Sequence, residues 1–340
     1  MPQLPNDFAP RLVAWYRLSR RRLPWRETRD PYRVWVSEIM LQQTRVETVK
    51  RYYERFMEVL PAVETLAAAG EETVMKLWAG LGYYRRARLL CECARIVAAA
   101  GRFPSTAAEL RRLPGIGRYT AGAIASIAFD EAAPAVDGNV LRVLARFRAA
   151  SVTTAAAERM LIRHYRRGEC GDFTQSLMEL GATVCLPNGE PECGRCPLAG
   201  DCRARALGTP TAFPPPAAKI ARKVELRTVL LLRHDGRIAL RRRPETGVLA
   251  GMWELPGAAG EKPEWGGEFG KVAATFRSRH IFTHLEWRML VLAVDCETES
   301  PEFVWSVPGE HPLPEAFAKL LRRNGNGPAR KDDGEGTVSR

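Results

Sequence analysis

The stretch Leu113–Gly122, LPGIGRYTAG, constrains the fold of this chain more than any other part of its sequence. It follows a helical segment that ends near Arg112 and leads into an apolar run, AGAIASIAF, with the composition of a buried helix. Glycine at positions 115 and 117 permits positive φ angles and lets the backbone approach a ligand closely. We therefore predict two packed helices joined by a glycine hairpin.

The same hairpin predicts an anion site. The N–H groups in the first turn of a helix have no partner within the helix, so they can bind a phosphate. We expect Gly115, Gly117 and Arg118 to contact DNA, although a plain glycine turn between helices is the alternative. The formal net charge of +12 favours a nucleic-acid partner. An arginine-rich proteome would give the same excess.

Two domains and a linker follow from the pattern of the chain. Residues 1–207 show helical periodicity, with helix starts at Asp30-Pro31 and at Thr106 with Glu109, and form a mainly α domain. Residues 208–223 are a proline-rich linker. Residues 224–322 form an α+β domain, and residues 323–340 a disordered tail. Within the α+β domain we predict strands over 226–233, 237–243 and 277–295, and a helix over 314–323.

Two carboxylates are candidates for acid–base chemistry. Glu38 stands in VWVSEIMLQQT, where burial among apolar neighbours raises a carboxyl pKa and suits it to general acid work. Asp137 lies in a glycine-containing loop before a helix, where it either caps that helix or supplies a fixed anion. Glycosidic cleavage needs an acid and such an anion. An ordinary surface glutamate remains the alternative for Glu38.

Four cysteines crowd into one short segment and predict a metal site. Zinc and an iron–sulfur cluster both accept four thiolates, and one close pair flanked by single cysteines favours the cluster. We expect the four remaining cysteines to be buried thiols. The predicted ligands are Cys185, Cys193, Cys196 and Cys202, and the remaining cysteines are Cys91, Cys93, Cys170 and Cys296.

Together these motifs resemble the helix–hairpin–helix GPD superfamily of DNA glycosylases, and within it the MutY-type adenine DNA glycosylases. The resemblance runs from about Asp7 to Cys202 and resumes in the second domain. It implies base flipping, because the target atom is unreachable in a stacked duplex. The segments that carry it are LPWR, VWVSEIMLQQT, GLGYYRRAR, LPGIGRYTAG, AVDGNV and the cysteine segment.

The resemblance also implies roles for individual residues. Glu38 matches the acid that protonates adenine, Asp137 the carboxylate that stabilises the cationic sugar, and Asn139 a residue that orients both. The four clustered cysteines match the ligands of a 4Fe-4S cluster. The matching DNA contacts are Arg26 near the adenine pocket, Gln42, and the wedge residues Gln43 and Tyr83.

Tyr119 indicates how the bond is broken. In the related endonuclease III enzymes the corresponding residue is a lysine, whose amine attacks the sugar and opens a route to strand cleavage. A tyrosine cannot form a Schiff base. Tyr119 therefore predicts a monofunctional glycosylase without strong lyase activity, in which the tyrosine assists at the sugar beside Asp137.

The second domain resembles the Nudix-like domain of the same family. It lacks the glutamate-rich REx2EE metal helix between Gly257 and Arg279, so nucleotide hydrolysis is not expected. The resemblance implies recognition of 8-oxoguanine opposite the adenine. Two departures are threonine where the family commonly has serine, and a first cysteine gap of seven residues instead of six. The residues expected to read the damaged base are His280, Phe282, Thr283 and His284.

The sequence as a whole predicts a monomeric enzyme that excises adenine opposite 8-oxoguanine or guanine in double-stranded DNA. With no apolar run long enough to span a bilayer and no signal peptide, we expect a cytoplasmic, nucleoid-associated bacterial protein without a membrane partner. Two alternatives stay open: a thymine or pyrimidine mismatch glycosylase, and a catalytically silent DNA-binding module held together by zinc. Intact Glu38, Tyr119, Asp137 and Asn139 speak against the silent module.

Overall fold

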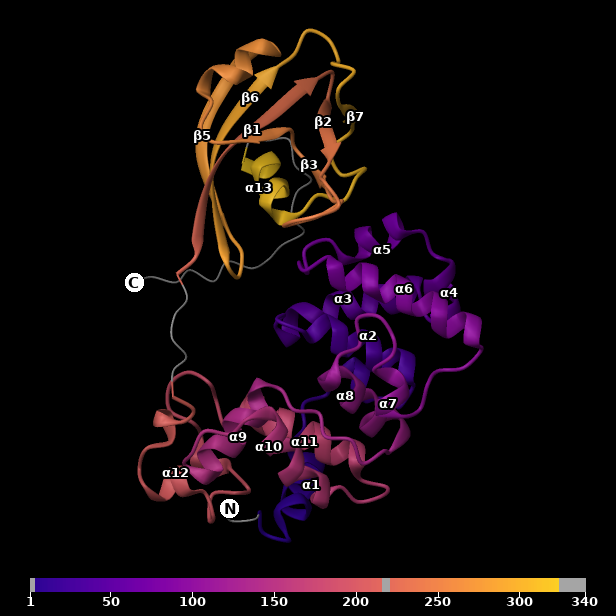
Figure 1. Ribbon diagram of the computed structural model, residues 1–340, viewed down its shortest axis with the longest axis vertical. Coiled ribbons are helices and arrows are strands. Elements are labelled where there is room, and N and C mark those ends of the chain that lie inside the picture. The colour runs from indigo at the N-terminus through magenta and orange to yellow at the C-terminus, as the bar shows by residue number, and fades with distance from the viewer. Residues whose placement is uncertain (1–3, 216–220, 324–340) are drawn as a thin grey trace. The chain divides into compact units, whose positions relative to one another are not determined.

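The computed structural model describes residues 4–215 and 221–323 and divides into two compact units (Figure 1). The helical unit holds the chain up to Ala69 together with Arg85–Ala218, and the sheet unit holds Gly70–Tyr84 and the chain from Lys219 onward. No helix in the described ranges is long and apolar enough to cross a membrane. The predicted disordered tail lies outside the described residues except for Arg323.

The helical unit is built around helices that are distant in sequence. Its main apolar cluster joins Phe8 and Leu12 of the first helix to Leu144 and to Phe173 and Leu177, all nearly inaccessible to solvent. The helices are α1 (Phe8–Ser19), α2 (Pro31–Leu41), α3 (Val46–Val59), α4 (Val63–Ala68), α6 (Arg85–Ala100), α7 (Ala107–Leu110), α8 (Arg118–Phe129), α9 (Gly138–Arg148), α10 (Thr154–Leu161), α11 (Cys170–Thr183) and α12 (Arg203–Ala206). Short 3₁₀ turns are η1 (Pro24–Arg26), η2 (Ile162–His164), η3 (Cys193–Arg195) and η4 (Pro210–Ala212).

The predicted helix starts are confirmed. The Asp30 carboxylate accepts hydrogen bonds from the backbone N–H groups of Tyr32 and Arg33, at 2.8 and 3.1 Å, with proline in the first turn. Thr106 and Glu109 form the reciprocal capping box. Both caps satisfy N–H groups that a helix start leaves without partners, which is why these short sequences specify the helix boundary.

Two glycines bring α8 close to the segment before α9 and α11 close to the start of α9. A Cβ atom at Gly122 would lie 2.5 Å from the Pro134 carbonyl oxygen, and one at Gly181 would lie 2.5 Å from the Asn139 Cβ atom. Real Cβ atoms do not approach other heavy atoms so closely, so only glycine permits this packing. The segment that carries Asp137 is thereby held between two helices.

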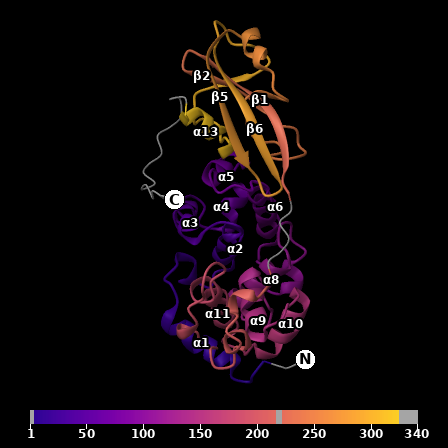
Figure 2. The same ribbon diagram turned by 90° about the vertical axis from the view of Figure 1, so that its left-hand side faces the viewer.

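The sheet unit is an open mixed sheet with strand order β3-β2-β1-β6-β5. Strand β1 runs parallel to β6, whereas β5 and β6 form the long antiparallel pair seen side by side in Figure 2. Its elements are α5 (Glu71–Trp78), β1 (Lys223–His234), β2 (Arg237–Arg242), β3 (Trp253–Glu254), β4 (Gly257–Ala259), η5 (Pro263–Glu268), β5 (Lys271–Ile281), β6 (Leu285–Asp295), β7 (Val304–Ser306) and α13 (Glu315–Arg323).

Alternate residues of β1 face two apolar clusters. Leu231 packs with Trp287 and with Phe317 of α13, while Leu230 packs with Trp265 on the opposite face. A strand that is buried on both faces has a continuous apolar sequence, as TVLLL does. The strands predicted over 226–233 and 237–243 and the helix predicted over 314–323 are present as β1, β2 and α13.

The stretch 277–295, which the sequence predicts as strand throughout, contains a turn. The N–H of Phe282 donates to the Leu285 carbonyl at 2.7 Å, so that β5 ends at Ile281 and β6 begins at Leu285. The turn has neither glycine nor proline, the residues that usually mark one. Strand β1 also begins at Lys223, within the predicted linker, and Pro210–Ala212 forms a 3₁₀ turn there.

Candidate active site

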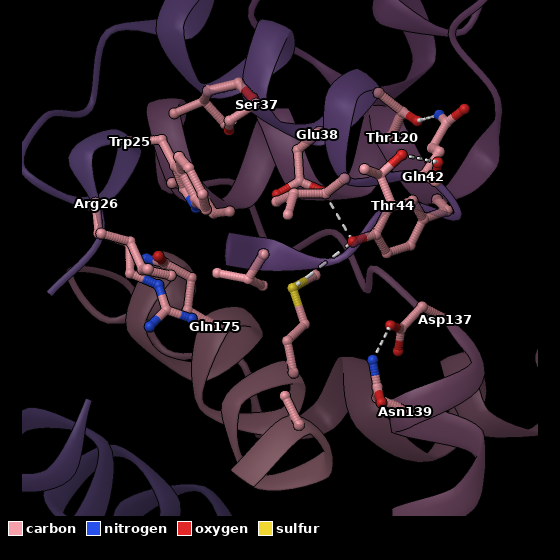
Figure 3. Close-up of a pocket in the computed structure, with 18 of the residues that line it drawn as sticks. Trp25, Arg26, Ser37, Glu38, Gln42, Thr44, Thr120, Asp137, Asn139 and Gln175 are labelled. Carbon is pink, nitrogen blue, oxygen red and sulfur yellow. Dashed lines mark hydrogen bonds between the residues drawn. The ribbon is translucent and has the colours of Figure 1, made fainter. Parts of the chain in front are cut away.

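A cavity of about 770 Å³ in the helical unit contains the four predicted catalytic residues (Figure 3). Helices α2 and α8 supply Glu38 and Tyr119, and the start of α9 supplies Asp137 and Asn139. Helix α11 and η1 complete the wall. Residues that are far apart in the sequence are thus brought around one space large enough to admit a ligand.

Glu38 lies inside the helical unit and is only 6% exposed, so the surface alternative does not hold. Burial, with a smaller contribution from the negative charge of Asp137, raises the pKa of its carboxyl to about 7. A hydrogen bond from Tyr119 and the positive charge of Arg26 oppose that rise. The carboxyl is therefore poised to hold or release a proton near neutral pH.

Tyr119 is the direct partner of Glu38. Its hydroxyl donates to Glu38 Oε2 at 2.8 Å and lies 3.7 Å from the sulfur of Met178. Burial, together with the charges of Glu38 and Asp137, raises the pKa of Tyr119 well above its usual range. The phenol consequently stays protonated and acts as a hydrogen-bond donor within the cavity.

Asp137 is both a helix cap and a wall of the cavity. Its Oδ1 accepts from the Val140 N–H at 2.8 Å, which is the capping bond, and its Oδ2 accepts from Asn139 Nδ2 at 2.7 Å. Figure 3 shows the Asp137–Asn139 pair in the wall of the cavity that also holds Glu38. The two interpretations of Asp137 that the sequence left open are therefore compatible.

Arg142, which the sequence did not single out, fixes the orientation of Asn139. Its Nη2 donates to Asn139 Oδ1 at 2.8 Å and to the Gly181 carbonyl at 2.7 Å, and its Nε donates to the Cys185 carbonyl at 2.9 Å. The guanidinium thus links the N-terminal end of α9 to α11 and to the first cysteine of the predicted metal-binding segment.

The two hairpin glycines differ. Gly115 has φ +77°, and a Cβ atom there would lie 2.8 Å from the Leu89 Cβ atom, so glycine is required. Gly117 is extended, with φ −83° and ψ 179°, so it does not use the positive φ that a glycine permits. It is the N-cap of α8, whose first-turn amides remain available to an anion. Arg118 forms an ion pair with Glu158.

Three of the predicted DNA-contact residues, Gln42, Gln43 and Tyr83, differ in their surroundings. Gln42 Nε2 donates to Thr120 Oγ1 at 3.4 Å, and both Gln42 and Gln43 line the cavity. Gln43 and Tyr83 have positive φ angles of 57° and 49°, which are costly for residues other than glycine. Such strain concentrates at functional positions. Tyr83, 47% exposed, belongs to the sheet unit, where its hydroxyl lies 2.8 Å from Thr283 Oγ1.

The four clustered cysteines border one small cavity of about 30 Å³, together with Arg146, whose Nη1 lies 3.4 Å from Cys185 Sγ. In the described part of the chain, no three potential ligand side chains are placed to share a single metal ion. Thiols around a common space suit a cluster in which several irons bind different cysteines. Of the remaining cysteines, Cys91, Cys93 and Cys170 are buried as predicted and Cys296 is partly exposed.

The four residues predicted to read the damaged base, at the end of β5 and in the turn after it, differ in exposure: two are partly buried and two are exposed. Phe282 packs on His280 and Trp287, with ring centroids 4.6 and 4.9 Å apart, whereas Thr283 and His284 are exposed. Burial and the charge of Lys319 lower the pKa of His280 to about 4, so this ring is neutral at physiological pH. No α-helix occurs in the described segment 257–279, in agreement with the missing metal motif.

Helix α11 contributes cavity residues that sequence reasoning missed. Gln175, Met178 and Ala182 line the cavity at helical spacing, and Glu179 lies beside them, bonded to Arg26. The available signal was weak: Gln175 and Glu179 stand at i and i+4, on one face of a helix that also holds other polar residues. Arg26, predicted to lie near the base pocket, also lines this cavity.

Residues 36–164 match the family described as "HhH-GPD superfamily base excision DNA repair protein", and residues 227–323 match the NUDIX domain. A solved structure of a thermostable thymine-DNA glycosylase is similar with a TM-score of 0.54 and 30% identity, covering 59% of this chain and 95% of that chain. The fold and the cavity therefore define a helix–hairpin–helix base-excision DNA glycosylase with an added Nudix domain.

Two curated relatives narrow the assignment. Adenine DNA glycosylase from Mus musculus is 36% identical over 85% of this chain and 71% of that protein. Adenine DNA glycosylase from Arabidopsis thaliana is 42% identical over 72% of this chain, which spans only 46% of that longer protein. The chain belongs to the adenine DNA glycosylase family, whose members are hydrolases of N-glycosyl bonds.

We predict that Arg142→Leu destabilises the protein by about 2–4 kcal/mol, because it leaves one buried and two partly buried acceptors without their donor. Urea unfolding followed by circular dichroism measures the change. Arg95→Leu, at an exposed position of α6, is the matched control and should stay within about 0.5 kcal/mol of the parent. Equal stability of the two variants would contradict the bridging role of Arg142.

Proposed function

We propose that this protein flips adenine out of double-stranded DNA where it is mispaired with 8-oxoguanine or guanine, and hydrolyses its N-glycosidic bond. The observation that carries the proposal is Glu38, a buried carboxyl with a pKa near 7 that shares its cavity with Asp137. A proton donor and a fixed carboxylate are the two groups that glycosidic hydrolysis requires. Family membership supplies adenine as the base.

Glu38 donates the proton. Protonated Glu38 transfers a proton to a ring nitrogen of adenine, and the bond between that base and the sugar C1′ breaks with its electron pair passing to the base. Asp137 stabilises the cationic sugar, held in place by the Val140 N–H and by Asn139. Water adds to C1′, and its released proton passes to a carboxylate of the site, which completes the hydrolysis.

The wall of η1 and α11 is suited to holding the flipped base. Trp25 offers an aromatic surface, and Gln175 and Arg26 offer polar groups within the same cavity. The carboxamide of Gln175 can both donate and accept hydrogen bonds, and the guanidinium of Arg26 can only donate. Gln43 and Tyr83, in strained backbone positions, are proposed to fill the space that the base leaves in the duplex.

Recognition of the opposite base is assigned to the sheet unit. Thr283 and His284 project from the turn between β5 and β6, and Phe282 anchors that turn on Trp287. The Thr283 hydroxyl can donate to an acceptor of 8-oxoguanine, and the Tyr83 hydroxyl lies 2.8 Å from it. Since Nudix relatives hydrolyse nucleotides with a glutamate-rich helix that this sequence lacks, binding without hydrolysis is the proposed role.

The cysteine segment is proposed to bind a 4Fe-4S cluster through Cys185, Cys193, Cys196 and Cys202. The fit rests on four thiols around one cavity, with the Arg146 guanidinium beside Cys185. When bound, the cluster would supply covalent ties that hold the cysteine segment itself together. We also propose that the protein acts as a monomer on chromosomal DNA, at the bacterial nucleoid.

Glu38→Gln removes the transferable proton, so we expect single-turnover excision to fall by about 10²–10⁴-fold while duplex binding persists. In the parent, excision should fall as the pH rises through about 7, because only protonated Glu38 is active. A buried carboxyl whose pKa is raised on folding weakens stability as the pH rises, so the variant should be the more stable protein above pH 7. Full activity of the variant would remove Glu38 from its role.

The substrate is tested with duplexes that contain A:8-oxoguanine, A:G, T:G or an oxidised pyrimidine. We expect adenine release, fastest opposite 8-oxoguanine, with strand breaks only after alkali because Tyr119 carries no amine. A borohydride-trapped covalent adduct would contradict the monofunctional assignment. Preferred cleavage at T:G would favour the thymine mismatch alternative, consistent with the similarity to a thymine-DNA glycosylase structure.

The purified protein should contain iron and acid-labile sulfide in equal amounts and show the broad visible absorbance of an iron–sulfur cluster. Cys196→Ser should lower both contents, because one ligand loses its thiolate. Cys93→Ser, at a buried position away from the cluster segment, is the control and should retain them. Zinc without iron in the aerobically and anaerobically purified protein would overturn the cluster assignment.

A further inference from the structure

Glu179, Arg21 and Arg26, none of them among the predicted catalytic residues, form a network of ion pairs at one wall of the cavity. Glu179 of α11 has a fully buried side chain. Its Oε1 accepts from the Arg21 backbone N–H and from Arg21 Nε, both at 2.9 Å. Its Oε2 accepts from Arg21 Nη2 at 2.7 Å and from Arg26 Nη2 at 2.8 Å. A carboxylate has about four acceptor positions, so those of Glu179 are filled.

Arg26 connects this network to the cavity. Its side chain is 9% exposed, its guanidinium lies over the Tyr16 ring at 5.4 Å, and its Nη1 donates to the Arg21 carbonyl at 3.3 Å. Figure 3 shows Arg26 beside Trp25 in the wall of the cavity that contains Glu38. The position of this cation therefore depends on Glu179, a residue that does not itself line the cavity.

We propose that Glu179 is a positioning residue that holds Arg26 in the cavity wall and, together with Arg21, sets the positive charge to which Glu38 is exposed. The network thereby determines the pH range in which Glu38 delivers its proton. This inference rests on the proposed acid role of Glu38.

The charges around Glu38 make the direction of the effect predictable. Tyr119 faces it from α8, Asp137 from the start of α9, and Arg26 from η1. Arg21, just before η1, lines the same cavity, and α11 contributes the uncharged Gln175 and Met178. Arg118 also lines the cavity, but it is paired with Glu158. The positive charge of Arg26 lowers the pKa of Glu38, so a stronger positive charge in this wall lowers it further.

Replacing Glu179 and replacing Arg21 change the net charge of the network in opposite directions. Two guanidiniums and one carboxylate give the network a net charge of +1. Glu179→Gln raises the network charge by one unit, and Arg21→Gln lowers it by one. Glu179 does not titrate itself near neutral pH: burial raises its pKa, but the bonds from Arg21 and Arg26 outweigh burial and lower it to about 2.

The test is the pH dependence of single-turnover adenine excision from an A:8-oxoguanine duplex. We expect the midpoint of the alkaline fall in rate to move down by roughly half to one pH unit in Glu179→Gln and up by a similar amount in Arg21→Gln. Arg22→Gln removes the same charge from the adjacent, exposed position and should leave the midpoint in place. The double variant restores the original network charge, and its midpoint should return toward that of the parent.

A merely structural role would lower the rate or the melting temperature without moving the two midpoints apart. Midpoints that shift in the same direction, or that stay within about 0.2 units of the parent, would overturn the inference. If Glu179→Gln does not fold, the inference is tested with Arg21→Gln and Glu179→Asp. Arg21→Gln should still raise the midpoint, whereas Glu179→Asp keeps the negative charge and should keep the parental midpoint. An active Glu38→Gln enzyme would instead contradict the proposed function.

Discussion

The burial of the Glu38 carboxyl group is the interaction on which the site depends. Removal of a carboxylate from water raises the free energy of its charged form, and the Tyr119 hydroxyl and the Arg26 charge offset only part of that cost. The result is a group that can hold a proton at neutral pH. The cavity walls keep that environment by surrounding Glu38 with α2, α8, α9 and α11.

Asp137, in the wall of the same cavity, is held in place by two hydrogen-bond donors. Asp137 accepts from a helix N-terminus and from Asn139, and Asn139 is oriented by Arg142. Asn139 also packs directly against Gly181, where a Cβ atom would lie only 2.5 Å from the Asn139 Cβ atom. In the proposed mechanism this fixed carboxylate is the group that stabilises the sugar as it becomes cationic.

The sequence predicted those parts of the fold that depend on interactions between residues close together in the chain. The caps at Asp30 and Thr106 specify helix starts because the donor and acceptor lie within three residues of one another. The turn at Phe282 escaped prediction because a short hydrogen-bonded turn needs neither glycine nor proline. Which hairpin glycine adopts a positive φ was left open, because a glycine permits that conformation without requiring it; Gly115 adopts it and Gly117 does not.

The sequence by itself determined the chemistry available: no amine at position 119, a glutamate among apolar residues, and four thiols in one segment. Only the tertiary structure decided which groups meet. It placed Glu38 and Asp137 around one cavity, and it joined Glu179 to Arg21 and Arg26. The physical reason is that side-chain chemistry belongs to each residue, whereas burial and charge pairing depend on how helices distant in sequence pack together.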